Sequence, residues 1–235
     1  MWPTEPAALE ADQRRLAEAR PQPWHPPPQA PLDVAGCWAC FPRGVSGVGH
    51  AGDPAWSAAA VTRAGRIVGR HVREGVADAP YLPGLMALRV GALLESVVRG
   101  LPHAPDVLLL DATGRDHPRR CGLAVHLGAT LDLPTVGVTH RPLGATGDWP
   151  PDRAGATSPL RLDGEVVACW LRTRAGTRPL VVHPGWRTDV ETALEVVEQA
   201  LSGRRTPEPL RQARRLARRA RTGLDTGPET RTISR

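Results

Sequence analysis

Near its centre the chain carries the stretch Val107-Leu108-Leu109-Leu110-Asp111-Ala112-Thr113-Gly114, in which a continuous apolar run is followed by an acid. A short, continuous apolar run is typical of a strand that is covered on both faces of a sheet. Open α/β sheets bind their ligands beside the carboxyl ends of such strands. The stretch therefore predicts a buried parallel strand over 107–110, with Asp111 as a candidate functional carboxylate at its end.

The patterns on either side of this strand predict the remaining helices and strands. Strands are expected at 34–41, 57–62, 66–73, 135–138, 166–172 and 180–182, and helices at 4–20, 85–98, 120–131 and 188–201. Three strands in meander order, followed by alternating helices and strands, predict a mixed α/β sheet flanked by helices. We expect strands 34–41 and 107–110 to be neighbours at its centre, which would bring Trp38 close to Asp111.

The length of 235 residues fits a single α/β domain. We expect an N-terminal helix and Pro-rich connector over 1–32, the folded domain over 33–203, and an Arg-rich C-terminal helix and tail over 204–235. No apolar run approaches the roughly 18 residues of a membrane span, and residues 1–30 lack the apolar stretch of a signal peptide. A cytoplasmic protein that does not enter a membrane is therefore expected.

The charge of the chain favours a polyanionic partner. The formal net charge is +6, and all 30 basic residues are Arg, so we expect nucleic acid as the partner class. Leu210, Ala213, Leu216 and Ala220 form an apolar stripe on the predicted C-terminal helix, with Arg on either side. This segment is either an arm that follows phosphates or a solvated helix with a frayed tail.

The cysteines and two further motifs leave alternatives open. Cys37 and Cys40 lie on a strand with their sulfurs on opposite faces, which opposes a shared metal, although a softer ion such as Zn²⁺ stays open. Residues 116–120 read Asp-His-Pro-Arg-Arg, which suits either metal-dependent phosphate chemistry or a capped helix entrance. Residues 80–84 hold the chain's one Tyr between two Pro, which suits either a wedge for a base stack or a packed loop tip.

Residues 33–215 resemble the endonuclease V family, which recognises deoxyinosine and cuts the strand nearby. The matching residues follow one another in the family's order: Ala35-Gly36, Pro80-Tyr81-Leu82-Pro83-Gly84, Asp111, Gly114, His117-Pro118-Arg119-Arg120, Gly122, His126, Gly128, Thr135-Val136-Gly137-Val138, Gly185 and Pro207-Glu208-Pro209-Leu210-Arg211. The resemblance implies a single-domain ribonuclease H-like fold and a monomer. It also implies a DNA repair nuclease that hydrolyses a phosphodiester near inosine, in DNA or RNA, with Mg²⁺ or with Mn²⁺ as substitute.

The resemblance also implies roles for individual residues. Asp111 would bind the metal, and His117 and His140 would act beside it at the phosphate. The residues expected to bind nucleic acid are Pro80, Tyr81, Gly114, Arg119 and Arg120.

Several family positions are substituted in this chain. The family's first acid falls at Trp38, its second acid at Val90, its active-site Lys at His140 and a late His at Trp186. Of the metal-site carboxylates, Asp111 is the one plainly retained, and Asp116, Asp189 and Glu95 are candidates to replace the others. Two hypotheses stay open: a metal-dependent endonuclease, or a catalytically impaired relative (a pseudoenzyme) that binds nucleic acid.

Overall fold

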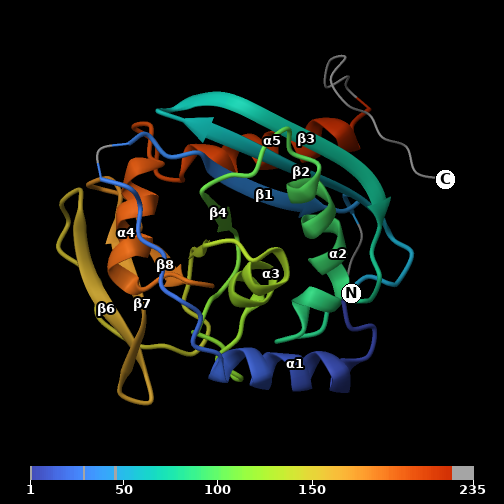
Figure 1. The fold of residues 1–235 in the computed structure, drawn as a ribbon, viewed down its shortest axis with the longest axis horizontal. Coiled ribbons are helices and arrows are strands. Elements are labelled where there is room, and N and C mark those ends of the chain that lie inside the picture. Colours follow the sequence, from blue (N-terminus) through green and yellow to red (C-terminus); the bar gives the residue numbers. More distant parts are fainter. Residues whose placement is uncertain (1, 29, 45–46, 224–235) are drawn as a thin grey trace.

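The computed structural model describes residues 2–28, 30–44 and 47–223. Within them, eight strands form one sheet in the order β3-β2-β1-β4-β5-β8-β7-β6 (Figure 1). The strands are β1 (Val34–Cys40), β2 (Pro54–Arg63), β3 (Arg66–Val76), β4 (Val107–Leu110), β5 (Thr135–Thr139), β6 (Ala156–Leu162), β7 (Glu165–Arg172) and β8 (Leu180–Pro184). The helices are α1 (Pro6–Glu18), α2 (Met86–Arg99), α3 (Leu123–Leu131), α4 (Val190–Gln199) and α5 (Glu208–Arg221).

The sheet is mixed, as the sequence predicts. β1, β2 and β3 form an antiparallel meander, and β1, β4 and β5 run parallel to one another at the centre. β8, β7 and β6 then continue the sheet in antiparallel pairs. The neighbouring positions of β1 and β4 confirm that expectation, and the whole forms the predicted single domain of a helix-flanked α/β sheet.

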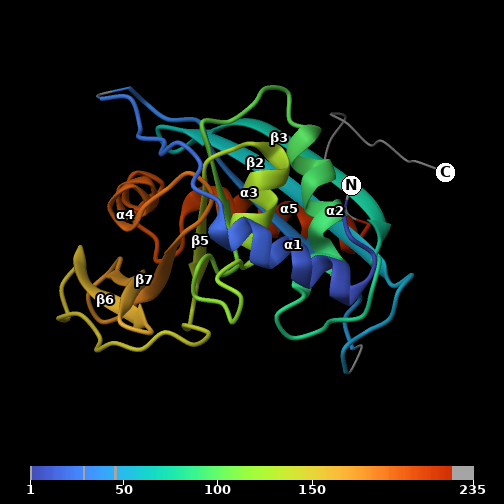
Figure 2. The ribbon, with the colours of Figure 1, turned by 60° about the horizontal axis from the view of Figure 1, so that its bottom comes forward.

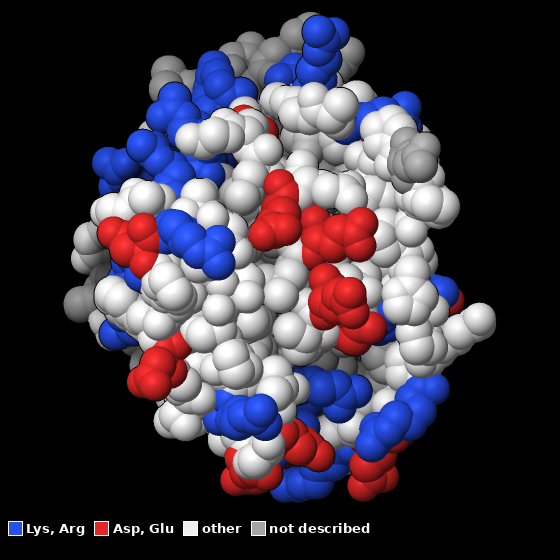
Figure 3. All heavy atoms as spheres, turned by 90° about the vertical axis from the view of Figure 1, so that its left-hand side faces the viewer, with Lys and Arg blue, Asp and Glu red and all other residues white. Residues whose placement is uncertain are grey.

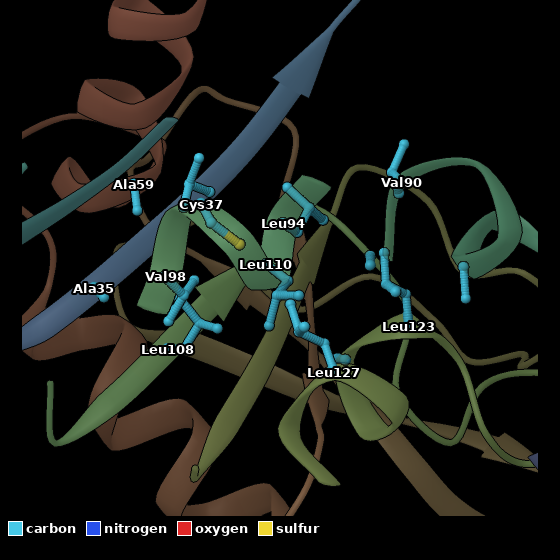
Figure 4. Packing of buried hydrophobic residues seen from close by; sticks show 14 of the residues in the cluster. Ala35, Cys37, Ala59, Val90, Leu94, Val98, Leu108, Leu110, Leu123 and Leu127 are labelled. Atoms are coloured by element: carbon cyan, nitrogen blue, oxygen red, sulfur yellow. The ribbon is translucent and has the colours of Figure 1, made fainter. Parts of the chain in front are cut away.

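The apolar run of β4 supplies both faces of the core. Leu108 and Leu110 belong to a buried cluster with α1, α2 and α3, whereas Val107 and Leu109 belong to a second cluster with α4 and the start of α5. Figure 4 shows Leu110 packed toward Leu127 of α3. Because successive strand residues point to opposite faces, a continuous apolar run fits a strand that is covered on both sides.

Two helices at the chain ends complete these layers. α1 lies across the ends of α2 and α3 (Figures 1 and 2), and it buries Leu9, Gln13 and Leu16. α5 packs on the other face of the sheet, over β1 and β2. It approaches β1 so closely that a Cβ on Gly36 would lie 2.5 Å from the carbonyl carbon of Pro209.

Apart from shifts of a few residues at element ends, such as the start of β2 at Pro54 instead of residue 57, the structure differs from the sequence predictions in three places. α3 begins at Leu123 rather than Arg120, because Arg120 adopts a left-handed φ of 54° that a helix excludes. β6 is a strand that the sequence pattern does not predict; its Pro159 is tolerated because β6 forms an edge of the sheet. On α5, Ala217 is buried, whereas Ala220 of the predicted stripe is half-buried.

The predicted frayed tail falls on residues 224–235, outside the described residues. Among the described helices, none has the length and apolar character needed to cross a bilayer.

Candidate functional site

Asp111 follows the last residue of β4 and lies beside Trp38 of β1. The register pairs Cys37 with Leu110, so the next residue on each strand, Trp38 and Asp111, falls at the same level of the sheet. One side chain of α5, Arg214, contacts both of them. The predicted closeness of Trp38 and Asp111 is therefore confirmed.

Arg214 makes an ion pair with the retained carboxylate. Its Nη2 donates to Oδ2 of Asp111 at 2.9 Å, and its guanidinium carbon lies 5.5 Å from the centroid of the Trp38 ring. Arg218, one helical turn further along α5, lies 5.1 Å from the same centroid. A cation over an indole face is attracted by the ring quadrupole, so the Trp38 ring and the Asp111 carboxylate together hold the Arg214 guanidinium in place.

A cavity of about 210 Å³ opens next to Asp111. It brings together two residues expected at the site from the sequence, Tyr81 and His117, with Asp111 itself. The remaining lining residues come from α1, α2, α3, the end of β5 and the loops before α2, after β4 and after β5: Gln13, Gly84, Met86, Ala87, Ala112, Thr113, Leu123, Thr139 and Leu143. The Tyr81 side chain is exposed. Apolar walls with a few convergent polar groups are the usual composition of a ligand pocket.

The loop that carries Tyr81 is held through one carbonyl oxygen. The carbonyl of Gly84 accepts from Nε2 of Gln13 at 3.0 Å, Nε2 of His117 at 3.1 Å and Nη2 of Arg119 at 3.0 Å. The backbone at Gly84 has a φ of 74°, a conformation that a side chain disfavours. These contacts give the aromatic loop a fixed position at the cavity.

The hydrogen bonds of His117 define its protonation state. Its Nδ1 accepts from the backbone N–H of Arg119 at 3.2 Å, so the proton lies on Nε2 and is donated to Gly84. Burial lowers the pKa of His117, which keeps the ring neutral. Both ring nitrogens are engaged, so in this structure His117 positions the Tyr81 loop; a catalytic role at the phosphate stays a prediction.

His140 lies close to the Asp111–Arg214 pair. Its Nδ1 accepts from Nη1 of Arg205 at 3.2 Å. Partial desolvation and the Arg205 guanidinium lower the pKa of His140, and the nearby carboxylate of Asp111 opposes that shift. The ring is therefore neutral at pH 7, with a guanidinium already bound to it.

The three acids considered as replacements for the missing carboxylates serve other parts of the fold. Asp116 is buried and accepts from the backbone N–H groups of residues 143, 144 and 145. Asp189 caps α4 by accepting from the N–H of Thr192, and Glu95 accepts from the indole of Trp2. None of the three is among the described residues that line the cavity.

Two of the substituted positions differ in how close they lie to this site. Val90 belongs to the same buried cluster as Ala87 and Leu123, both of which line the cavity. Trp186, in contrast, donates its backbone N–H to Oγ1 of Thr135, the first residue of β5. Because β5 runs parallel to β4, Trp186 lies toward the opposite end of these strands from Asp111 and is not among the described residues that line the cavity. That it replaces a family residue stays a prediction.

The remaining residues expected to bind nucleic acid have intramolecular roles. Arg119 holds the Tyr81 loop, and Arg120 donates to the carbonyl of Leu162 and pairs with Asp163. A Cβ on Gly114 would lie 2.0 Å from the carbonyl oxygen of Pro184, so the glycine is required for packing. Phosphate contacts by these residues and by Pro80 stay predictions.

The donor set around Asp111 does not fit a divalent cation. Asp111 is the one carboxylate among the described residues that line the cavity, and its Oδ2 already accepts from Arg214. The described residues contain no group of three or more His, Cys, Asp and Glu side chains that could hold a metal. Mg²⁺ needs well-placed oxygen ligands, and a guanidinium repels it.

The cysteines do not supply the missing metal ligands. Cys37 and Cys40 belong to buried clusters on opposite faces of the sheet, as the strand spacing predicts. Burial also raises the pKa of Cys37 to about 12, so its sulfur stays protonated and is a poor metal ligand.

Sequence reasoning missed three residues of the site: Gln13, Thr139 and Arg214. Gln13 and Arg214 lie on helices. The periodicity of a helix indicates which of its faces is buried, but it does not indicate which residues of the fold that helix will contact. The Asp111–Arg214 pair joins residues 103 positions apart in the chain. Thr139 directly precedes His140 at the end of a predicted strand, which is the signal that could have indicated it.

Comparison with known proteins gives a consistent result. A family model described as Endonuclease V matches residues 44–215. Endonuclease V of Roseiflexus sp. (strain RS-1) is 40% identical over 183 residues, which cover 76% of this chain and 82% of the relative. The crystal structure of Endonuclease V from Streptomyces avermitilis superposes with a TM-score of 0.83 at 31% identity, covering 94% of this chain and 95% of that one.

A further structure shares the fold at lower identity. Endonuclease V of Ciona intestinalis, solved in complex with a 24-mer DNA that contains an inosine followed by a ribo-adenosine, superposes with a TM-score of 0.74. It is 20% identical and covers 93% of this chain and 98% of that chain. Together the solved structures confirm the predicted ribonuclease H-like class of fold.

Proposed function

Because the chain belongs to the endonuclease V family, we propose that it binds nucleic acid at inosine, a deaminated purine nucleoside, without metal-dependent cleavage of the strand. The observation that carries this proposal is the Asp111–Arg214 ion pair, in which a guanidinium occupies the retained carboxylate. The Tyr81 loop and the cavity beside it support recognition of a base, whereas Asp111 is the one carboxylate among the described residues that line the cavity.

The cavity beside Tyr81 is the proposed site for the base. Its volume of about 210 Å³ is below the roughly 300–1,000 Å³ of pockets that take whole drug-sized ligands, so it suits a heterocyclic base better than a whole nucleotide. The exposed Tyr81 ring can fill the space that an extruded base leaves in the stack. The complex of the Ciona intestinalis protein with inosine-containing DNA supports the same substrate class.

Arg214 supplies positive charge at the place where the family's metal would be expected. Its guanidinium offers planar donors that match a phosphate group. Arg205 and Arg218 lie nearby, so a dication would enter a site that is already cationic. The retained Asp111 therefore orients Arg214 in this account.

The second candidate function is the family's hydrolysis of a phosphodiester near inosine with Mg²⁺ or Mn²⁺, by Asp111, His117 and His140. It is favoured by the 40% identity to a relative named Endonuclease V over most of both chains. The two candidates differ in one observable, which is strand cleavage.

A nicking assay separates the two candidates. A duplex with a single inosine is incubated with the protein in Mg²⁺, in Mn²⁺ and in EDTA, beside Asp111→Ala, and the products are separated on a denaturing gel. We expect retention of the duplex in a binding assay and no nicked product in any lane. Metal-dependent nicking that Asp111→Ala abolishes would establish the hydrolase and overturn our proposal.

A further inference from the structure

A groove of about 780 Å³ lies along α5, and arginine dominates its lining. Eight of its eleven lining residues are Arg, and no acidic side chain lines it within the described part of the chain. Figure 3 shows basic side chains gathered at the upper left of the face that it displays, while acidic side chains lie across the middle. We call the groove along α5 the arginine groove; its arginines are Arg174, Arg204, Arg205, Arg211, Arg214, Arg215, Arg218 and Arg219.

The docking of α5 on the sheet relies mainly on its apolar face and not on this concentration of charge. α5 buries Leu210, Ala213, Leu216 and Ala217 against the sheet, so its arginines project from the remaining surface. Like charges three or four residues apart destabilise a helix. Within the described residues, Arg211 pairs with Glu208 and Arg214 pairs with Asp111. Because every basic residue of the chain is Arg, the absence of Lys from the groove needs no further reason. The gathering of the arginines in one groove does need one. A polyanion explains both the sign and the location of the charge.

The arginine groove and the base cavity meet at the Asp111–Arg214 pair. Asp111 lines the cavity and Arg214 lines the groove, and 2.9 Å separates the paired atoms. The Nε of Arg214 is buried and has no hydrogen-bond partner among the described residues. The Asp111–Arg214 pair therefore forms the junction between the two spaces.

We propose that the arginine groove binds the phosphodiester backbone of the strand whose inosine base occupies the cavity. The strand leaves the cavity past Arg214 and continues along α5, with its phosphates facing the arginines. This inference rests on the proposed function and adds the path of the backbone to it. Arginine pairs with phosphate oxygens through two parallel N–H groups, and continuity with the base cavity favours a nucleic acid over other polyanions.

The test is the salt dependence of binding. Affinity for duplex DNA falls as salt rises, and each phosphate that a protein neutralises makes the slope of log affinity against log salt steeper by about 0.9. Arg204 and Arg215 line the groove, are exposed and take no part in the cavity. We expect Arg204→Gln with Arg215→Gln to make this slope shallower by about 2 for an inosine duplex and for a matched adenosine duplex alike. The ratio of the two affinities, which reports recognition of the base, should stay at the wild-type value.

A matched control removes the same charge elsewhere. Arg66 and Arg153 are exposed and lie outside the lining of the groove, so Arg66→Gln with Arg153→Gln should leave the slope at the wild-type value. Equal slopes in the groove variant and in this control would overturn the proposal. So would a poly-glutamate competitor that displaces the duplex as well as adenosine DNA of equal charge.

The same titrations keep the two proposals distinguishable. A wild-type protein without preference for inosine would contradict the proposed function, whereas the slope comparison would still decide the groove. Thermal melting verifies that both double variants are folded. If the groove variant melts early, Arg204→Gln alone repeats the test in the connection before α5, where no helical packing is at stake.

Discussion

At the scale of single residues, hydrogen bonds to the carbonyl oxygen of Gly84 hold the aromatic loop, residues 80–84, in position. It accepts hydrogen bonds from Gln13 of α1 and from His117 and Arg119 of the segment before α3. A loop that is fixed before binding pays less ordering entropy when the ligand arrives. The Tyr81 ring is thus held beside the cavity in the position that a wedge requires.

Replacing Tyr81 tests this role of its ring. We expect Tyr81→Ala to weaken binding to a duplex with an inosine by roughly 1–3 kcal/mol, the usual value of one base–aromatic stack. Tyr81→Phe keeps the ring and should bind within about a factor of three of wild type, since a factor of ten corresponds to about 1.4 kcal/mol. Fluorescence anisotropy with duplex and single-stranded probes gives both values. Equal losses on the two probes for Tyr81→Ala would mean that the ring only packs the loop.

His126 makes stability depend on pH. Burial lowers its pKa from 6.5 to about 4, and its ring lies 4.6 Å from that of Trp2. The unfolded chain binds this proton near pH 6.5, so the stabilisation is complete above that pH and is lost as the pH falls toward 4. Between these values His126 should contribute a slope of about 1.4 kcal/mol per pH unit to the free energy of unfolding.

The variant His126→Phe keeps an aromatic ring against Trp2 and cannot take up a proton. Urea unfolding at several pH values between 4 and 6.5 should give a slope that is shallower than that of wild type by about 1.4 kcal/mol per pH unit. The buried His183, whose pKa is also lowered, should leave part of the wild-type slope in place. An identical slope in the two proteins would show that His126 titrates normally in the fold.

At the scale of secondary-structure elements, α5 delivers Arg214 to the end of β4. Its close approach to the sheet depends on Gly36, because a Cβ there would lie 2.5 Å from Pro209 and 2.6 Å from the backbone nitrogen of Leu210. Neither atom belongs to a flexible side chain. The docking of α5 and the position of Arg214 are therefore coupled.

Gly36→Ala tests this coupling. We expect a loss of about 1–3 kcal/mol in the free energy of unfolding, the usual cost of overpacking a core, and weaker binding of inosine DNA as Arg214 moves. Gly144→Ala is the matched control, because the nearest atoms to its Cβ lie at 3.7 Å, and it should change stability by less than about 0.5 kcal/mol. Chemical denaturation measures both. A Gly36→Ala protein as stable as the control would contradict the close docking of α5.

The elements themselves were largely predictable from local pattern. The run 107–110 gave a buried central strand because it is apolar at every position, and the spacing of Leu210, Ala213 and Leu216 indicated a helix with one buried face. β6 was not predicted from the sequence because Pro159 argues against a strand unless that strand is known to lie at the edge of the sheet. The start of α3 was misplaced because a left-handed residue such as Arg120 has no clear mark in the sequence.

At the scale of the whole molecule, the site combines segments that are far apart in the chain. Sequence reasoning placed Trp38 beside Asp111, because both follow from the pairing of two predicted strands. It could not place Arg214, since helical periodicity does not say which part of the sheet a helix covers. It also assigned Trp186 to the site, although the antiparallel direction of β8 carries that residue to the opposite end.

In the proposed function, Arg214 takes the place of a metal ion in the binding of nucleic acid. The most direct measurement is an anisotropy titration of inosine duplex in EDTA and in Mg²⁺ at matched ionic strength, for wild type and Arg214→Gln. We predict equal wild-type affinity in the two buffers and a loss of about tenfold or more in the variant under both, as expected when a charged hydrogen-bond donor is removed. Wild-type binding that tightens specifically with Mg²⁺, or a variant that binds as well as wild type, would contradict the account.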